Sequence, residues 1–176
     1  IFNVEKIDDK TIQFTKSFKL QGSTYILRKK YSFKDDENVF KLDVMLHNGE
    51  GKALDYNGVA YTIRTSPQIG PHYDPKKDRY EYRQFVAFDG NKYKKVQLSN
   101  GQFKKYEKNI TWCGIVGKYF AELVIPSQTE IINTSYYSSK VETNNYANAQ
   151  ALIERRATSG GDVQDTYYMY FGPRSE

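Results

Sequence analysis

Apolar and polar residues alternate through three successive stretches near the start of the chain, residues 11–20, 24–33 and 39–46. Successive side chains of a strand point to opposite faces, so this period of two is typical of a strand with one buried face. Turn-forming residues separate the stretches, at 21–23 and 35–38. The three stretches therefore predict an antiparallel meander. Its buried face would hold Ile12, Phe14, Phe18, Leu20, Tyr25, Leu27, Tyr31, Phe33, Phe40, Leu42, Val44 and Leu46.

Strand-like patterns recur later, at residues 59–65, 79–88, 129–137 and 163–171. Asp89-Gly90-Asn91 predicts a hairpin turn between residues 79–88 and the stretch YKKVQL. About ten short strands joined by turns favour an antiparallel sandwich or barrel. Nothing in the sequence divides residues 1–176 with a linker, so the pattern indicates one all-β domain.

The most apolar run is WCGIVGKYFAELVIP, residues 112–126. A membrane-spanning helix needs about 20 apolar residues, whereas this run is shorter and contains Lys118 and Glu122. A charge near the bilayer centre costs at least about 2.5 kcal/mol. The run is therefore predicted to form a pair of buried strands. The residues that suit a strand covered on both faces are Tyr119, Phe120, Leu123, Val124 and Ile125.

Residues 146–156, YANAQALIERR, stand apart from the strand patterns on either side. They are rich in residues that favour helices, and local propensity predicts a helix here.

Composition narrows the function classes. The chain is 39 % hydrophobic and 15 % aromatic, which is typical of a folded domain rather than a disordered segment. Its net charge of +5 comes from lysines scattered in pairs, without the dense basic stripe or module of a nucleic-acid reader. A surface that touches anionic lipid headgroups stays an alternative. The one cysteine, Cys113, excludes an internal disulfide and is expected to be a buried, inert thiol.

Candidate chemistry is sparse. Histidine occurs twice, at 47 and 72, and a catalytic pair of either with Cys113 stays an alternative, although no known nucleophile signature surrounds the cysteine. A structural zinc site would need clustered Cys and His, so we expect no metal and no cofactor. Loop carboxylates are candidates for glycosidase-like acid–base pairs, although solvated surface charges explain them better. These carboxylates are Glu50, Asp55, Asp74, Asp78 and Glu81.

Tyrosines surround a proline-rich loop that spans residues 66–75. Tyr73, Tyr80 and Tyr82 could line a cleft for a peptide or a sugar, because tyrosine offers apolar area and a polar hydroxyl. Arg64, at the end of the preceding strand, is a further candidate contact. The alternative interpretation is that these tyrosines pack across neighbouring strands.

Four motifs in chain order add a resemblance. FTKSFKL (14–20) is followed by TYILRKKYSF, YTIRTSPQIGP spans 61–71, the apolar run spans 112–126, and YMYFGPR spans 168–174. Together they resemble the periplasmic domain of YidC-type membrane protein insertases. The residues that carry the last two motifs are Trp112, Lys118, Tyr119, Phe120, Pro126, Gly172 and Pro173.

This resemblance implies an antiparallel β-supersandwich similar to galactose mutarotase, with little helix and with residues 146–156 as a strand. It implies a non-catalytic domain on the periplasmic face of the bacterial inner membrane, within a multi-pass protein whose helical bundle carries the insertase activity. The implied partners are the Sec translocon, the SecDF accessory complex and nascent membrane proteins.

The family's domain usually has more sequence before Ile1 and a helix after the Gly-Pro motif, so the resemblance implies that the chain is a fragment of a larger periplasmic domain. The alternative function is a carbohydrate-binding or mutarotase-like protein on the same fold, since a fold does not fix a function.

Overall fold

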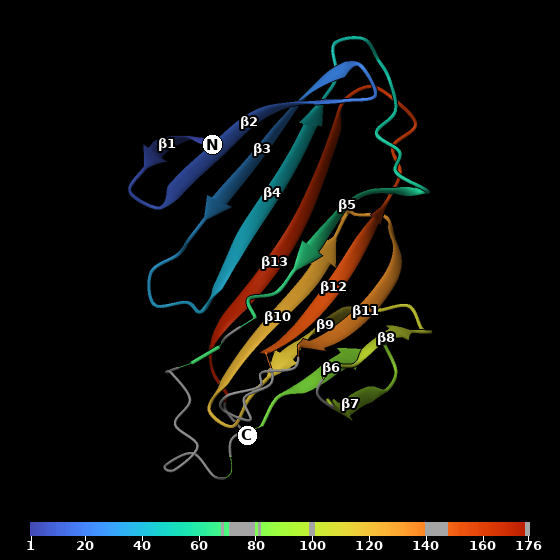
Figure 1. The fold of residues 1–176 in the computed structure, drawn as a ribbon. Coiled ribbons are helices and arrows are strands. Elements are labelled where there is room, and N and C mark those ends of the chain that lie inside the picture. The colour runs from blue at the N-terminus through green and yellow to red at the C-terminus, as the bar shows by residue number, and fades with distance from the viewer. Residues whose placement is uncertain (68, 71–79, 81, 99–100, 140–147, 175–176) are drawn as a thin grey trace.

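The computed structural model describes residues 1–67, 69–70, 80, 82–98, 101–139 and 148–174. Within these ranges the chain forms 13 strands and no helix, in two antiparallel sheets (Figure 1). The described residues thus contain no helix long and apolar enough to cross a membrane. The expected all-β, antiparallel architecture is confirmed, with more strands than the estimated ten.

The larger sheet has nine strands. Their spatial order is β1 (Asn3–Asp8), β2 (Thr11–Leu20), β3 (Ser23–Ser32), β4 (Val39–His47), β13 (Val163–Pro173), β10 (Phe120–Ser127), β9 (Trp112–Val116), β6 (Gln84–Phe88) and β7 (Tyr93–Gln97). The smaller sheet has the order β5 (Val59–Arg64), β12 (Asn148–Arg156), β11 (Ile131–Ser139) and β8 (Phe103–Tyr106).

The predicted meander is confirmed as β2, β3 and β4, which are consecutive neighbours in the larger sheet. Gln21 and Gly22 have φ of 50° and 80° and make the tight turn between β2 and β3. A positive φ at both central positions matches the right-handed twist of the paired strands. Across this hairpin Phe18 stacks on Tyr25 with ring centroids 5.5 Å apart.

The main core lies where the smaller sheet packs on the β13–β10–β9–β6 half of the larger one, with β12 against β9 and β6. Phe85 of β6 is fully buried and stacks on Tyr136 of β11, with ring centroids 4.6 Å apart. Val86 and Ala87 beside it are also fully buried, so β6 is covered on both faces. Aromatic contacts between the sheets therefore hold the sandwich together.

The apolar run of residues 112–126 forms the hairpin of β9 and β10, which confirms the predicted strand pair. Cys113 is fully buried, and burial raises the pKa of its thiol, as expected of an inert cysteine. The prediction of a buried strand residue is wrong for Tyr119, which lies in the bend before β10 and is 56 % exposed.

The helix that local propensity predicts at residues 146–156 is wrong, and the strand that the resemblance implies is confirmed. Residues 148–156 form β12, which is hydrogen-bonded between β11 and β5. Ala149, Ala151 and Ile153 are buried, and the residues between them are not. Pairing on both edges and burial with period two override the helical preference of the individual residues.

Other boundaries also differ from the pattern. β1 is exposed along its whole length and three of the four residues of β8 are exposed, so neither shows an apolar face that would have revealed it. The strand predicted from residue 79 begins at Gln84: Tyr80 lies in a turn and Tyr82 precedes the strand, while residues 79 and 81 lie outside the described ranges.

Candidate functional site: a groove beside strand β5

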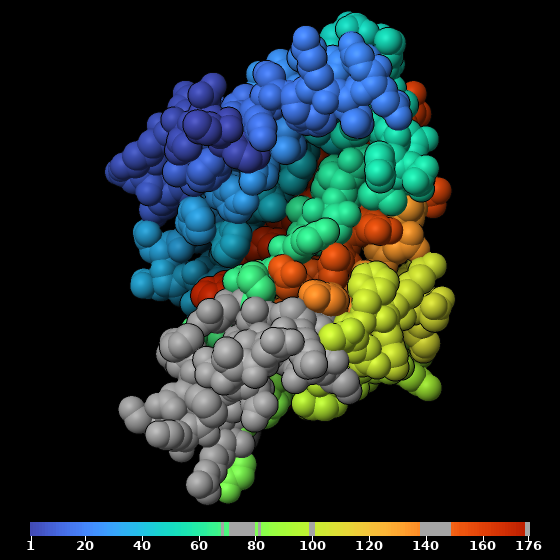
Figure 2. All heavy atoms as spheres, in the orientation of Figure 1, coloured from blue at the N-terminus to red at the C-terminus, as the bar shows by residue number. Residues whose placement is uncertain are grey.

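The N-terminal strands of the larger sheet extend past the smaller sheet, so none of the described strands of the smaller sheet covers that part of their apolar face (Figure 1). A groove of about 550 Å³ lies there, between this face and β5. Figure 2 shows it as the hollow between the blue N-terminal strands and green β5. Its floor is mostly apolar and includes Leu27, Leu42 and Leu46.

One wall of the groove is the edge of β5. Residues 60–64 line it in unbroken succession, although the side chains of a strand alternate between faces. Consecutive residues therefore present the backbone edge of the strand. β5 is the terminal strand of the smaller sheet and pairs with β12 on its other edge.

Two cationic side chains line the same groove. Lys29 of β3 is half-buried, and burial lowers the pKa of its ammonium group. Its Nζ lies 4.4 Å from the ring centroid of Phe2, a cation–π geometry. Arg64 is exposed at the end of β5. Neither has an ion-pair partner among the residues that the structure describes.

Glu122 of β10 is the acidic residue of the groove. It is 9 % exposed, and its carboxylate oxygens accept hydrogen bonds from the backbone N–H of Ser66 at 3.0 and 2.9 Å. Burial raises the pKa of Glu122, and the bond from Ser66 offsets this in part. The carboxylate fastens the segment after β5 to the larger sheet.

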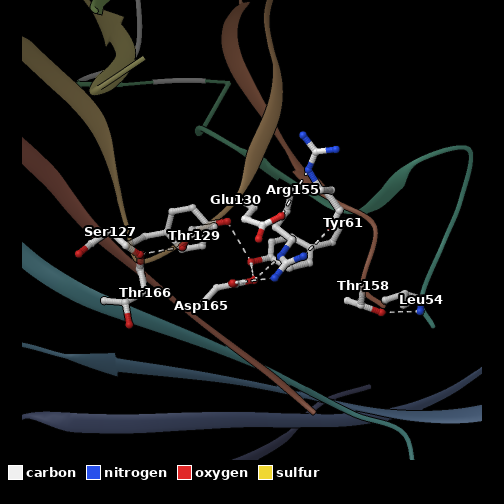
Figure 3. A network of polar contacts seen from close by, with 11 residues as sticks. Leu54, Tyr61, Ser127, Thr129, Glu130, Arg155, Thr158, Asp165 and Thr166 are labelled. Atoms are coloured by element: carbon white, nitrogen blue, oxygen red, sulfur yellow. Dashed lines mark hydrogen bonds and ion pairs between the residues drawn. The ribbon is translucent and has the colours of Figure 1, made fainter. Parts of the chain in front are cut away.

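Tyr61, which faces the groove from β5, belongs to a buried polar network between the sheets (Figure 3). Arg155 of β12 donates from Nε and Nη2 to the carboxylate of Asp165 of β13, at 2.9 and 3.2 Å. The Tyr61 hydroxyl donates to the same carboxylate at 2.6 Å and lies 2.9 Å from the Tyr167 hydroxyl. Asp165 is 1 % exposed, so the network joins β5, β12 and β13 across the sandwich.

The titration of this network suits a structural role. Burial works against the charge on Arg155, but its bonds to Asp165 outweigh that and raise the pKa of the guanidinium. Burial raises the pKa of Tyr167 to about 12, and it raises the pKa of Tyr61 further. Both phenols are thus held neutral at physiological pH, where they donate and accept hydrogen bonds but cannot serve as bases.

The carboxylates and histidines considered for catalysis do not converge in the described part of the chain. His47 pairs through Nδ1 with Asp162 at the surface. Glu50 pairs with exposed Lys52 at 3.2 Å, and the Asp55 side chain accepts from the Gly58 N–H at 2.7 Å. The described ranges hold no group of three or more His, Cys, Asp or Glu placed to bind a metal. Residues 72, 74, 78 and 81 lie outside them.

The described residues proposed for a cleft have different neighbours. Arg64 lines the groove. Tyr80 is 79 % exposed and carries Lys118 Nζ 5.9 Å from its ring centroid. Tyr82 is contacted by the Arg174 guanidinium. These two tyrosines therefore lie at the β9–β10 turn and the end of β13, and residue 73 lies outside the described ranges.

The motif residues occupy structural positions around β10. Trp112 stacks on Phe88, with ring centroids 5.9 Å apart, and Lys118 Nζ lies 4.8 Å from the Tyr119 ring centroid. Pro126, Phe120 and Ala121 of β10 lie opposite Tyr167, Pro173 and Gly172 of β13. A Cβ at Gly172 would lie 2.7 Å from the Asn38 side chain, which explains glycine there.

The buried carboxyl of Glu122 makes a testable contribution to the pH dependence of stability. Its pKa in the folded domain is raised above the ordinary 4.5, so the folded state holds the proton to a higher pH than the unfolded chain. Its stabilising contribution is complete below pH 4.5 and is lost as pH rises through the folded pKa. Glutamine does not titrate. We expect the free energy of unfolding of the wild type, relative to that of Glu122→Gln, to fall from pH 4.5 to neutral pH. Urea unfolding of both proteins at each of these two pH values measures the difference. Parallel pH profiles of the two proteins would contradict the shift.

Comparison with known proteins adds two kinds of likeness. The family model described as the YidC periplasmic domain matches residues 4–176. The chain is 34 % identical to the membrane protein insertase YidC of Treponema denticola over 188 aligned residues, which cover 100 % of this chain and 32 % of that protein. It is 31 % identical to that of Treponema pallidum, over 70 % of this chain and 20 % of that protein. The chain thus spans about a third or less of the length of these relatives.

Among solved structures, a putative aldose 1-epimerase from Escherichia coli matches with a TM-score of 0.60 at 8 % identity, over 98 % of this chain and 69 % of that one. A galactose mutarotase-like protein from Lactobacillus casei matches with a TM-score of 0.58 at 10 % identity, over 97 % of this chain and 72 % of that one. These likenesses show the mutarotase-like fold that the sequence motifs implied. The family model matches residues 4–176 and the alignment to the Treponema denticola insertase covers all of the chain. The chain therefore belongs to the YidC periplasmic domain family.

Proposed function

We propose that this chain is a non-catalytic periplasmic domain that helps a membrane protein insertase on the bacterial inner membrane to insert and fold its substrates. The match to the YidC periplasmic domain along residues 4–176 carries the proposal. The buried network and Glu122 are consistent with a structural rather than a chemical use of these polar groups, because their hydrogen bonds hold neighbouring strands together. The domain's role would then be docking or holding, with the transmembrane part of the intact protein responsible for insertion.

The partners follow from the same proposal. An insertase works alone or with the Sec translocon, and a periplasmic domain is placed to meet the SecDF accessory complex and the emerging parts of nascent membrane proteins. The exposed aromatic residues and the apolar groove provide surface for such contacts.

The test replaces residues 1–176 within the intact insertase by an unrelated β-sandwich of similar size. We expect the replacement to reduce co-purification of SecDF from detergent extracts and to slow insertion of a reporter protein that needs the Sec translocon. A second intact protein carrying Lys104→Gln, on an exposed edge, serves as a control and should behave as wild type. Unchanged co-purification and insertion after the replacement would reject the proposal.

A sugar-binding function is the second candidate, and the mutarotase-like fold is the observation that favours it. At 8–10 % identity the likeness concerns the fold alone. Calorimetric titration with galactose and glucose, together with polarimetry of freshly dissolved sugar, distinguishes the two candidates. The insertase proposal predicts no heat of binding and no faster mutarotation; saturable binding of a hexose would favour the alternative.

A further inference from the structure

We propose that the groove binds an extended polypeptide segment that adds as a strand to the free edge of β5, with apolar residues at alternate positions and an acidic side chain beside Arg64. This inference rests on the proposed function, because it specifies what the docking domain would hold. It is carried by three observations together: a strand edge and two cations that have no strand or anionic partner among the described residues, and an apolar floor.

The register of β5 shows which backbone groups are free. The Thr65 N–H donates to the Ala151 carbonyl at 3.1 Å, so Thr65 and Ala151 form a hydrogen-bonded position of the ladder. Hydrogen-bonded positions alternate along an antiparallel pair, which makes Ile63 opposite Ile153 the next one. The N–H and C=O of Thr62 and Arg64 therefore point away from β12, toward the groove.

This edge is uncovered for most of its length. Val59, at its start, pairs with Tyr56 through two backbone hydrogen bonds, of 2.8 and 3.2 Å. From Ala60 to Arg64, the described residues provide no second strand on that side. Unpaired donors and acceptors on an edge strand are the usual template for strand addition by a peptide.

The floor of the groove selects the added side chains. Alternate side chains of a strand paired with β5 would point toward the uncovered face of β2, β3 and β4, where the groove exposes Phe18, Leu27 and Phe40. The intervening side chains would face solvent. A segment with apolar residues at every second position thus buries them without placing polar groups on the apolar floor.

Charge distinguishes among such segments. Arg64 and Lys29 give the groove two positive side chains, and the carboxylate of Glu122 is already bonded to the Ser66 N–H. An acidic side chain in the segment gains an ionic partner at Arg64, whereas a basic one is repelled. A fatty acid also combines an anionic group with an apolar chain, but it makes no use of the β5 edge. The open edge therefore favours a polypeptide.

The test measures binding of fluorescently labelled peptides of about six residues, the usual length of a strand, to the intact insertase in nanodiscs by anisotropy. The lead peptide alternates valine with polar residues and includes one glutamate. In two modified peptides, alternate amides are N-methylated on one edge or on the other. Methylation on the edge that pairs with β5 removes hydrogen bonds and should weaken binding roughly tenfold. Methylation on the opposite edge should leave the affinity unchanged.

Two variants locate the site. Thr62→Pro removes an outward N–H on an edge strand and should weaken the lead peptide, with thermal unfolding checked to show that the domain stays folded. Arg64→Gln should weaken the glutamate peptide by about two- to fivefold and leave its glutamine counterpart nearly unchanged. A basic counterpart should bind more weakly than either.

Equal effects of methylation on both edges would overturn strand addition. If oleate binds and none of the peptides binds or displaces it, the groove would instead be assigned to a lipid anion. A third outcome is that no peptide binds, although replacing residues 1–176 by an unrelated β-sandwich still reduces SecDF co-purification and reporter insertion. That result would reject this inference and leave the proposed function standing.

Discussion

Replacing Arg155 by methionine is expected to lower the free energy of unfolding by about 3–5 kcal/mol. Arg155 is 9 % exposed and donates two of its hydrogen bonds to the carboxylate of Asp165, which is 1 % exposed. Methionine keeps most of the side-chain volume but leaves the Asp165 carboxylate buried with the Tyr61 hydroxyl alone. An uncompensated buried charge costs far more than an exposed one.

The neighbouring residue provides a matched control. Arg156 pairs with Glu130 at 3.3 Å, but both side chains are well exposed to solvent. Arg156→Met should therefore cost about 1 kcal/mol or less. Urea unfolding of the 176-residue chain, followed through the fluorescence of its one tryptophan, Trp112, measures both. Equal losses for the two substitutions would show that the network does not hold β12 to β13.

Gly114→Ala is expected to destabilise the domain by about 1–3 kcal/mol or more. Gly114 lies in β9 between β6 and β10, opposite Val86 and Leu123. A Cβ built there would lie 2.0 Å from the Glu122 carbonyl oxygen and 2.8 Å from the Leu123 Cα. Both are backbone atoms of the neighbouring strand, so the strands themselves would have to separate.

Gly49→Ala is the control, because its Cβ would meet no described atom closer than the His47 side chain at 3.8 Å. Thermal unfolding of the two variants should show a clearly lower Tm for Gly114→Ala and a nearly unchanged one for Gly49→Ala. If the Gly114 variant unfolded at the wild-type temperature, the tight β9–β10 packing would be refuted.

The parts of the fold with a clear period of two could be predicted from the sequence. β2, β3 and β4 alternate cleanly because one face is covered and the other is solvated. β1 and β8 show no such pattern, since every residue of β1 is exposed and β8 buries Tyr106 alone among its four residues. Residue preference alone predicts a helix at β12, because that preference takes no account of the pairing with β11 and β5 on its two edges.

The candidate site was less predictable, for a related reason. The sequence pointed to Arg64, but not to Lys29 and Glu122, which line the same groove. The three residues belong to strands that are far apart in the sequence, and only the fold brings them to one groove. Asp165 and Arg155 look like ordinary surface charges in sequence, and only the stacking of the two sheets buries them together. Tyr80 and Tyr82 are predicted cleft residues because they lie near a proline-rich loop in sequence, but neither is among the residues that line the groove.

The most direct test of a docking role uses a photo-reactive amino acid at Thr62, on the open edge of β5, in the intact insertase in its native membrane. A matched protein carries the same amino acid at Asn91, in the exposed β6–β7 turn. Ultraviolet irradiation during membrane protein synthesis, followed by mass spectrometry, identifies what is captured. The account predicts extended, apolar-alternating polypeptide segments linked to position 62 and absent from position 91. Capture of no polypeptide at position 62, or of the same polypeptides at both positions, would contradict it.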